Sequence, residues 1–360
     1  MRLLFVNQKL SFAGTSSYTL DLAMALRCMG DEVRICTTGG DLRRAFTDAG
    51  IETYLVKFNF FSFRKLLEFL KEYRPHLLHI QNQRSATFGQ KLSQKLDLPH
   101  IVTVHRSPDI SSPRLLHSNL VGVIAANEVI RAALVNNQGI PKSLVRVVER
   151  GVNTEVLTPG RSVEPGTPAS AAENRLIPVV GSVGSITRVK GHHVFLEAAR
   201  RVLDRGVEAM FAIVGEGEDE PYLRKLVREL RLEPHVTFSA HIPDRRELFR
   251  TFDIVVVPTL RGGVGSTALE AMSVGKPVIA SAVGEILHII EDGKTGILVP
   301  EGDKESLAEK IAELIANPGL CRTLGSNARA YVVDHFALAP MVKATREFYE
   351  DVESRISERS

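Results

Sequence analysis

Residues 253–281 read DIVVVPTLRGGVGSTALEAMSVGKPVIAS, and this stretch decides the fold of the chain. A short apolar run at 254–257 is followed by a proline, a glycine-rich turn, a helical pattern and a second apolar run at 277–280. Short apolar strands that alternate with helices are typical of parallel α/β sheets. The stretch therefore predicts one strand–turn–helix–strand unit of such a sheet.

The turn in this unit has the composition of a phosphate-binding turn. Its glycines are Gly262, Gly263 and Gly265. Without a Cβ, they let a ligand approach the backbone closely. Ser266 or Thr267 is expected to cap the helix that follows. The unpaired N–H groups and the positive dipole end of a helix suit an anion. Glu270 lies about one helical turn further on, where a sugar hydroxyl attached to the phosphate could lie.

Two other interpretations of the turn remain open. Residues 263–268 match the dinucleotide pattern G-x-G-x-x-A between a strand and a helix. That pattern expects an acidic residue at the end of the next strand, and Ser281 stands there. Alternatively, the glycines serve only tight packing of the helix on the strand. The sequence favours phosphate binding in a cleft between two domains.

Length and composition indicate an ordinary water-soluble protein of two domains. The chain has 360 residues, 44% hydrophobic and 24% charged, with a net charge of +3. A mildly basic balance fits anionic ligands and does not require nucleic acid. Three cysteines without metal-ligand spacing argue against a disulfide scaffold and favour a reducing, cytoplasmic location. The first ten residues predict a strand rather than a signal peptide, and no apolar run approaches the length of a membrane span.

The alternation of strands and helices occurs twice. Residues 1–160 form the first predicted α/β domain, with strands at 3–6, 33–36, 77–80, 101–104 and 121–125 and a helix that Ser16 opens. Residues 161–175 form a linker rich in proline, glycine, serine and alanine. A second α/β domain is expected over 176–336. The final helix, 337–360, has apolar positions that need a partner surface.

Three further stretches follow strands, where ligands bind in doubly wound sheets. Residues 181–191 read GSVGSITRVKG, in which Arg188 and Lys190 could bond a diphosphate, or simply form a solvated basic loop. His105 directly follows the strand at 101–104, although a lone histidine is often structural. The turn at 12–16, FAGTS, includes Gly14 and Thr15 and could hold an anion or merely begin a helix.

Other stretches bear on nucleotide, metal and membrane binding. Asp292-Gly293-Lys294-Thr295 is similar to the end of a P-loop, but His288 occupies the place of its first glycine. No Asp-x-Asp pair occurs, so the sequence has no evident divalent-metal clamp for a diphosphate. Residues 57–65, KFNFFSFRK, combine phenylalanines with cations, and such a stretch can bind an anionic membrane face or simply bury its aromatic rings.

These motifs together resemble family 4 of the retaining glycosyltransferases, which has the GT-B fold of two Rossmann-like domains and an interdomain cleft. The similarity covers nearly the whole chain and is densest over 176–300. It is carried by Pro258–Gly265, LEAM at 269–272, GKPVIA at 275–280, VKG at 189–191, VGEG at 214–217 and DGKTGILVP at 292–300.

The resemblance implies a role for each matched residue. Glu270 corresponds to the second glutamate of the Glu-x7-Glu motif, which holds the ribose hydroxyls. Lys190 neutralises the diphosphate, with help from Arg188, and His105 lies near the donor sugar. His241 and Ile242 are expected to contact the nucleotide base. The other expected substrate-binding residues are Gly14, Thr15, Gly184, Ser185 and Gly215, together with the turn residues Arg261, Gly262, Gly263, Val264, Gly265, Ser266 and Thr267. The final helix is expected to cross back to the first domain.

The chain departs from the family pattern at two positions. Gly262 stands where the first glutamate of the motif contacts the sugar, and Ser185 replaces the usual arginine; Arg261 or Arg188 could restore a charge. The resemblance implies a retaining, metal-independent hexosyltransferase of cell-envelope polysaccharide synthesis. It would use a nucleotide sugar, a carbohydrate, lipid-linked or small-molecule acceptor, and no cofactor. The alternatives are a GT-B epimerase or phosphorylase, a non-catalytic nucleotide-sugar sensor and, most distantly, an NAD enzyme.

Overall fold

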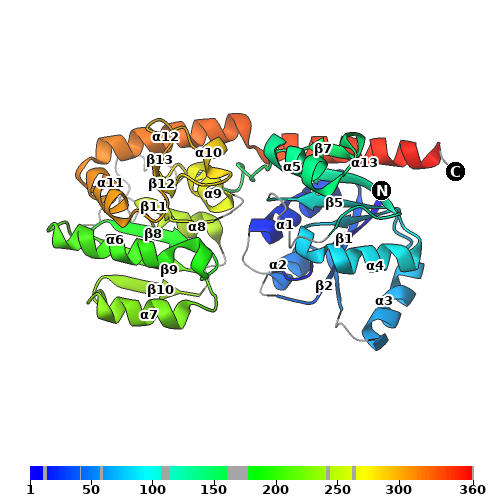
Figure 1. Ribbon diagram of the computed structural model, residues 1–360, viewed down its shortest axis with the longest axis horizontal. Coiled ribbons are helices and arrows are strands. Elements are labelled where there is room, and N and C mark those ends of the chain that lie inside the picture. The colour runs from blue at the N-terminus through cyan, green and yellow to red at the C-terminus, as the bar shows by residue number, and fades with distance from the viewer. Residues whose placement is uncertain are drawn as a thin grey trace, which may run out of the picture. The chain divides into compact units, whose positions relative to one another are not determined.

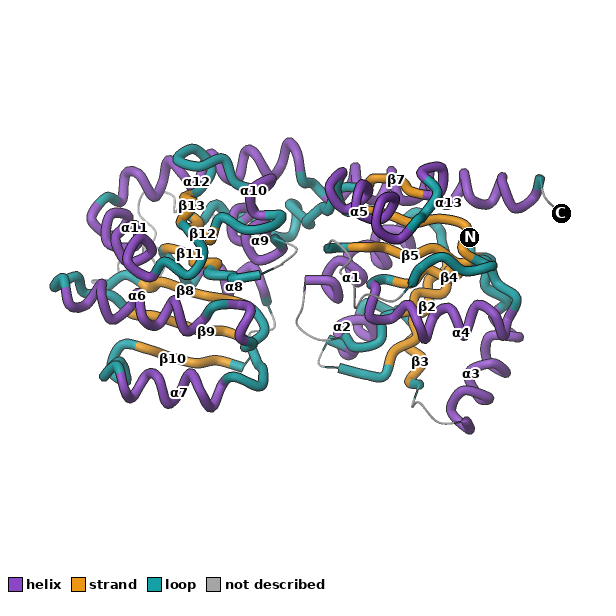
Figure 2. The backbone as a smooth tube through the Cα atoms, in the orientation of Figure 1, coloured by secondary structure: helices purple, strands orange, loops and turns teal. Residues whose placement is uncertain are grey.

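The strands of the chain form two separate parallel sheets, of seven and six strands. The structure is a computed structural model and describes residues 1–10, 14–40, 42–56, 60–106, 114–159, 177–240, 244–261 and 265–358. The chain divides into one unit of Met1–Gly151 with Leu338–Ser360 and a second unit of Val152–Ala337. In each unit, helices cover both faces of the sheet (Figures 1 and 2). The predicted doubly wound α/β architecture is confirmed.

The sheet of the first unit has the order β3-β2-β1-β4-β5-β6-β7. Its strands are β1 (Arg2–Val6), β2 (Glu32–Thr37), β3 (Glu52–Leu55), β4 (Leu77–Ile80), β5 (His100–Val104), β6 (Leu120–Ala125) and β7 (Val145–Val147). Its helices are α1 (Gly14–Cys28), α2 (Arg43–Asp48), α3 (Phe60–Tyr73), α4 (Ala86–Leu96), α5 (Glu128–Gln138) and α13 (Leu338–Ser357), with short 3-10 turns η1 (Gln83–Ser85) and η2 (Lys142–Leu144).

The sheet of the second unit has the order β10-β9-β8-β11-β12-β13. Its strands are β8 (Val179–Val183), β9 (Met210–Val214), β10 (Val236–Ser239), β11 (Ile254–Val257), β12 (Val278–Ser281) and β13 (Ile297–Val299). Its helices are η3 (Arg188–Lys190), α6 (His192–Asp204), α7 (Glu220–Glu229), α8 (Arg245–Arg250), α9 (Ser266–Ser273), α10 (Ile286–Ile289), α11 (Lys304–Ala316) and α12 (Pro318–His335).

The central strands are apolar because both of their faces are covered. All residues of β4, β5, β11 and β12 are buried. A parallel sheet with helices on both sides gives such continuous apolar runs rather than an alternating pattern. The predicted strand at 77–80 therefore coincides with β4, and the helix expected to begin at Ser16 starts two residues earlier, at Gly14.

The final helix finds its partner surface in the first unit. Met341, Val342, Phe348 and Val352 of α13 are buried in one hydrophobic cluster with residues of α1 and β1. In Figure 1, both marked ends of the chain belong to this unit. Periodicity predicted the apolar face of the helix, and the packing shows what that face covers.

The first unit ends earlier along the chain than the expected boundary at 160. Residues 152–159 belong to the second unit: Arg329 donates hydrogen bonds to the carbonyl oxygens of Thr154 and Leu157 at 2.8 and 2.9 Å, and Ser273 Oγ donates to Leu157. The predicted linker at 161–175 lies outside the described residues.

All three cysteines are free. Among the described residues, no helix combines the length and the apolar character that a membrane crossing requires.

Candidate functional site

The order of the second sheet reverses between β8 and β11. The chain proceeds outward from β8 through β9 to β10, and then returns to build β11, β12 and β13 on the other side. In open parallel sheets, ligands bind beyond the strand carboxyl ends at such a switch point. The loops after β8 and β11 are therefore the expected ligand-binding site of this unit.

A hydrogen bond between backbone groups joins these two loops. The amide of Leu260, after β11, donates to the carbonyl of Val189, after β8, at 2.9 Å. Gly191 has φ of +71°, and a Cβ placed on it would lie 1.8 Å from the carbonyl oxygen of Pro258. Because that contact leaves no room for a side chain, glycine is required where the lysine-bearing turn approaches β11.

The loop after β9 packs on the same turn. A Cβ on Gly215 would lie 1.9 Å from the carbonyl oxygen of Gly184, and one on Gly217 would lie 2.0 Å from that of Ile186. The amide of Gly184 donates to Val214 and that of Gly215 to Ser239. The structure thus brings Gly184, Ser185 and Gly215 together along one edge of the sheet.

The two cations predicted for the diphosphate lie in different surroundings. The exposed guanidinium of Arg188 lies over the ring of Tyr222 on α7, 4.9 Å from its centroid, and a hydrogen bond with Tyr222 raises the pKa of this arginine. Lys190 is half-buried and lies near His192, whose pKa is lowered to about 4 by burial first and by Lys190 second. Lys190 is thus the cation held at the loop junction, whereas Arg188 is directed toward α7.

The helix after the glycine-rich turn is not capped by a side chain. Gly265 occupies the N-cap position of α9 with φ of +58°, and neither Ser266 nor Thr267 caps the helix, so the predicted cap is wrong. The positive φ favours glycine at this position, and a Cβ there would also displace Cδ1 of Ile289, which would lie 1.9 Å away. The hydroxyl of Thr267 instead donates to the carbonyl of Val183, at 3.3 Å. This bond ties α9 to the end of β8.

Glu270 is a buried carboxylate with an arginine partner. Glu270 is 5% exposed. Its Oε1 accepts a hydrogen bond of 2.5 Å from Nη1 of Arg245, the first residue of α8. A buried charge needs such a partner, because desolvation otherwise disfavours the charged form. Arg245 was missed by sequence reasoning, since it lies 25 positions away and in no recognised motif.

The first unit gathers polar residues at its own switch point, between β1 and β4. His105, at the end of β5, is 5% exposed, and its Nε2 lies 3.0 Å from the carbonyl oxygen of Gln81. Its ring meets the ring of Tyr18 edge-on, with centroids 4.7 Å apart. The guanidinium of Arg150 lies 5.7 Å from the centroid of the Tyr18 ring, and it donates to the carbonyl of Gly14. His105 and Gly14 thus lie in one buried polar group, to which Thr15 connects through the hydrogen bond from Thr19 to its carbonyl.

Five predicted substrate-binding residues lie outside the described part of the chain: His241, Ile242, Gly262, Gly263 and Val264. Arg261 is exposed at the end of the described part of its loop. Among the residues that the structure describes, no cluster of three or more His, Cys, Asp or Glu side chains could hold a metal ion.

Four buried histidines should make stability depend on pH. Burial lowers the pKa of His79 and His105 to about 3 and that of His100 and His192 to about 4. An unfolded histidine titrates near 6.5, so between about pH 6.5 and 4 the unfolded chain binds protons that the native chain does not. The free energy of unfolding therefore falls as pH falls through this window, by up to about 1.4 kcal/mol per pH unit for each histidine.

Urea unfolding across that window measures the slope. We expect a smaller slope in His100→Gln, since a buried histidine with a lowered pKa is removed. An unchanged slope in His100→Gln would contradict the lowered pKa of His100.

Two family models match the chain, one in each half. Residues 12–156 match the model described as Glycosyltransferase Family 4, and residues 169–331 match the one described as Glycosyl transferases group 1. Two Rossmann-like units with these loops define a protein of the GT-B class. The chain belongs to the family 4 type of GT-B glycosyltransferase, because the two matches together extend over most of its length.

Individual relatives are similar over part of their length. CapM of Staphylococcus aureus, a capsular polysaccharide biosynthesis glycosyltransferase, is 30% identical over 160 residues, which are 44% of this chain and 42% of CapM. D-inositol 3-phosphate glycosyltransferase of Kribbella flavida is 26% identical over 280 residues, which are 70% of this chain and 66% of the relative. The chain thus spans less than two thirds of the length of either relative.

The solved structures extend the likeness to the whole fold. Anabaena Alr3699/HepE in complex with UDP-glucose has a TM-score of 0.81, with 98% of this chain and 100% of that chain covered at 21% identity. The GT-B fold expected from the sequence is confirmed.

Proposed function

We propose that this protein transfers a sugar from a nucleoside diphosphate sugar to a carbohydrate or lipid-linked acceptor, with retention of anomeric configuration and without a metal ion. The observation that carries the proposal is the junction at the β8/β11 switch point. There the loop bearing Lys190 is hydrogen-bonded to the loop after β11, which leads into the helix bearing Glu270.

Each part of this junction suits one part of the donor. The ammonium group of Lys190 and the N-terminus of α9 would stabilise the negative charge that develops on the leaving diphosphate. The Glu270 carboxylate would accept hydrogen bonds from the ribose hydroxyls. In this scheme the acceptor attacks from the face that the diphosphate leaves, and no protein nucleophile is required. The absence of an Asp-x-Asp pair from the sequence supports a metal-independent mechanism.

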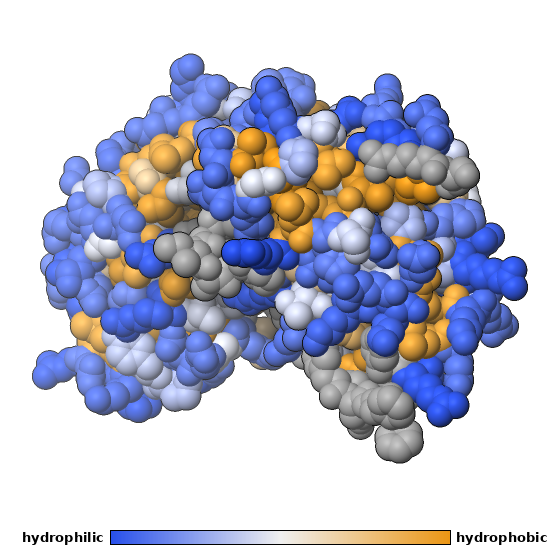
Figure 3. All heavy atoms as spheres, turned by 45° about the vertical axis from the view of Figure 1, so that its right-hand side comes forward, coloured by the Kyte–Doolittle hydropathy of each residue, from blue (hydrophilic) through white to orange (hydrophobic). Residues whose placement is uncertain are grey.

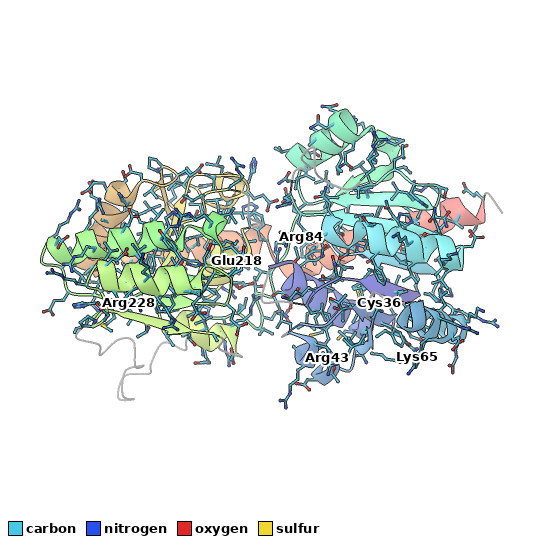
Figure 4. The ribbon with its side chains drawn as sticks, turned by 60° about the horizontal axis from the view of Figure 1, so that its bottom comes forward. Cys36, Arg43, Lys65, Arg84, Glu218 and Arg228 are labelled. Carbon is cyan, nitrogen blue, oxygen red and sulfur yellow. The ribbon has the colours of Figure 1, made fainter. Side chains whose placement is uncertain are left out.

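The acceptor is proposed to belong to cell-envelope polysaccharide synthesis, because CapM and other relatives have that role in their names. A membrane-bound acceptor also fits the surface beside the stretch 57–65, of which residues 57–59 lie outside the described part of the chain. Leu55 is 50% exposed, Phe69 is 40% exposed, and Lys65 is exposed on the same helix as Phe69. Figure 4 shows Lys65 and Arg43 on the lower side of the first unit. Figure 3 shows that hydrophobic residues reach the surface of the molecule in several places among hydrophilic ones. Co-sedimentation with anionic against neutral vesicles tests this contact.

Thermal-shift screening against UDP-, GDP- and ADP-sugars tests the donor class. UDP-glucose is the first candidate, because the similar HepE structure contains it. A ligand at 100 times its dissociation constant stabilises the native state by about 2.7 kcal/mol. Donor binding followed by transfer to an added acceptor supports the proposal. Binding without any turnover indicates a sensor, and isomerisation of the donor sugar indicates an epimerase.

Arg245→Ala tests the role given to Glu270. We expect the KM for the donor to rise at least about tenfold, because a hydrogen bond to a charged group contributes about 1.5–3 kcal/mol and Arg245 fixes the carboxylate. Arg246→Ala is the matched control, since Arg246 follows on the same helix and pairs with Asp244 and Glu247 instead. Equal KM values in the two variants would contradict the role of Arg245.

A further inference from the structure

A continuous run of buried polar side chains crosses the first unit from α13 to α1. The hydroxyl of Tyr349, on α13, lies 2.6 Å from Nδ1 of His79 on β4. The other ring nitrogen of His79, Nε2, lies 2.7 Å from the hydroxyl of Thr103 on β5. Tyr349 and His79 are completely buried, and Thr103 is 1% exposed. Such contacts inside a core fix the positions of the groups that make them, because an unpaired polar group there is costly.

The protonation states are consistent with an unbroken run. Burial lowers the pKa of His79 to about 3 and raises that of the Tyr349 hydroxyl well above 10, so both groups are neutral. A neutral imidazole has one donor and one acceptor nitrogen. Each nitrogen faces a hydroxyl group, which can donate or accept, so either tautomer of His79 satisfies both contacts.

The run continues from Thr103 to Tyr18 on α1. Burial raises the pKa of the Tyr18 hydroxyl, and hydrogen bonds with Thr103 and with Thr345 of α13 oppose part of that rise. The ring of Tyr18 contacts His105 edge-on at 4.7 Å, and the Arg150 guanidinium that holds the Gly14 carbonyl lies over the same ring. The ring of Tyr18 therefore contacts both His105 and the arginine that holds Gly14.

We propose that Tyr349 is a positioning residue, which holds His105 and the start of α1 in place through His79, Thr103 and Tyr18. The last helix of the chain then contributes to the sugar site as well as to the core. His79 and Tyr349 are 270 positions apart in sequence. As far as activity is concerned, this inference rests on the proposed function.

The test compares Tyr349→Phe with Tyr73→Phe. Tyr73 is the matched control because it is also a buried tyrosine of the first unit, and its hydroxyl donates to backbone carbonyls, those of Leu3 and Glu32, away from His105. We expect Tyr349→Phe to lower kcat about tenfold with an unchanged KM for the donor, since a 1 Å misplacement can cost up to about a hundredfold. Tyr73→Phe should leave kcat unchanged and lose only stability.

A second readout does not depend on turnover. The ring resonances of His105, assigned by their loss in His105→Gln, should shift in Tyr349→Phe and stay in place in Tyr73→Phe. If the protein transfers no sugar, these resonances still decide the positioning role. Equal stability losses in the two variants, with His105 undisturbed in both, would overturn the inference.

Thr103 provides an independent pair of variants if Tyr349→Phe fails to fold. Thr103→Val removes the hydroxyl at nearly constant shape, whereas Thr103→Ser keeps it. We expect the His105 resonances to shift in the valine variant and to return to the wild-type position in the serine variant. The same spectrum in both variants would overturn the inference.

Discussion

Lys190→Ala should lower kcat by about 10²–10³, because the loss of one preorganised donor to a developing charge costs about 2.7–4 kcal/mol in the barrier. Lys190 is half-buried at the junction of the loops after β8 and β11, where its charge is screened less than on an open surface. The KM for the donor should change much less, since the charge of the diphosphate grows as the glycosidic bond breaks. Steady-state kinetics with the donor identified by thermal shift measure both constants.

Folding must be separated from chemistry in this experiment. Lys225→Ala removes a lysine from the exposed face of α7, where it pairs only loosely with Glu229 at 3.3 Å, and should alter neither kcat nor the melting temperature. A Lys190→Ala protein that loses turnover and melting temperature together would make Lys190 a structural residue and would remove the central support of the proposed function.

Gly191→Ala should have the largest effect on stability. The left-handed backbone at this position costs about 1–3 kcal/mol for a residue with a side chain. In addition, the new Cβ would lie 1.8 Å from the Pro258 carbonyl oxygen, and forcing extra atoms into a packed site adds about 1–3 kcal/mol. We expect the free energy of unfolding to fall by about 3 kcal/mol or more. Donor affinity should fall with it, since the two loops are forced apart.

Gly206→Ala is the matched control for backbone strain. Gly206 belongs to the same unit and has φ of +76°, close to that of Gly191, but a Cβ there would meet nothing within 4 Å. It should cost about 1–3 kcal/mol, the contribution of the left-handed conformation alone. Chemical denaturation of the two variants measures the difference. Equal losses of stability in Gly191→Ala and Gly206→Ala would contradict the close contact between the loop bearing Gly191 and the loop bearing Pro258.

The positions of the site loops followed from sequence because they depend on local chemistry. Short apolar runs mark the buried strands, and the turns after them carry glycine where another backbone approaches closely. The loop with Lys190, the strand before His105 and the helix with Glu270 were all placed in this way. The cap of that helix was predicted wrongly, since Ser266 and Thr267 have the right chemistry but Gly265 has the required backbone angle.

Contacts between distant side chains did not follow from sequence. The apolar face of the last helix was evident from its spacing, but a pattern of spacing does not name the surface that covers the face. Glu270 pairs with Arg245, and Tyr349 pairs with His79. Which helices and strands lie close enough to form these pairs depends on the order of the strands in each sheet. Arg245, Tyr349 and His79 belong to none of the motifs that the sequence reveals.

The sequence by itself determined the α/β alternation, the glycine turns at the strand ends and the membership in a glycosyltransferase family. These properties depend on periodicity, on backbone freedom and on short motifs, all of which are local. Only the tertiary structure decided that Arg188 faces Tyr222, that Arg245 holds the buried Glu270 carboxylate, and that Tyr349 of α13 pairs with His79. The reason is physical: a buried charge or hydroxyl must find a partner, and the topology of the sheet determines which residue is within reach.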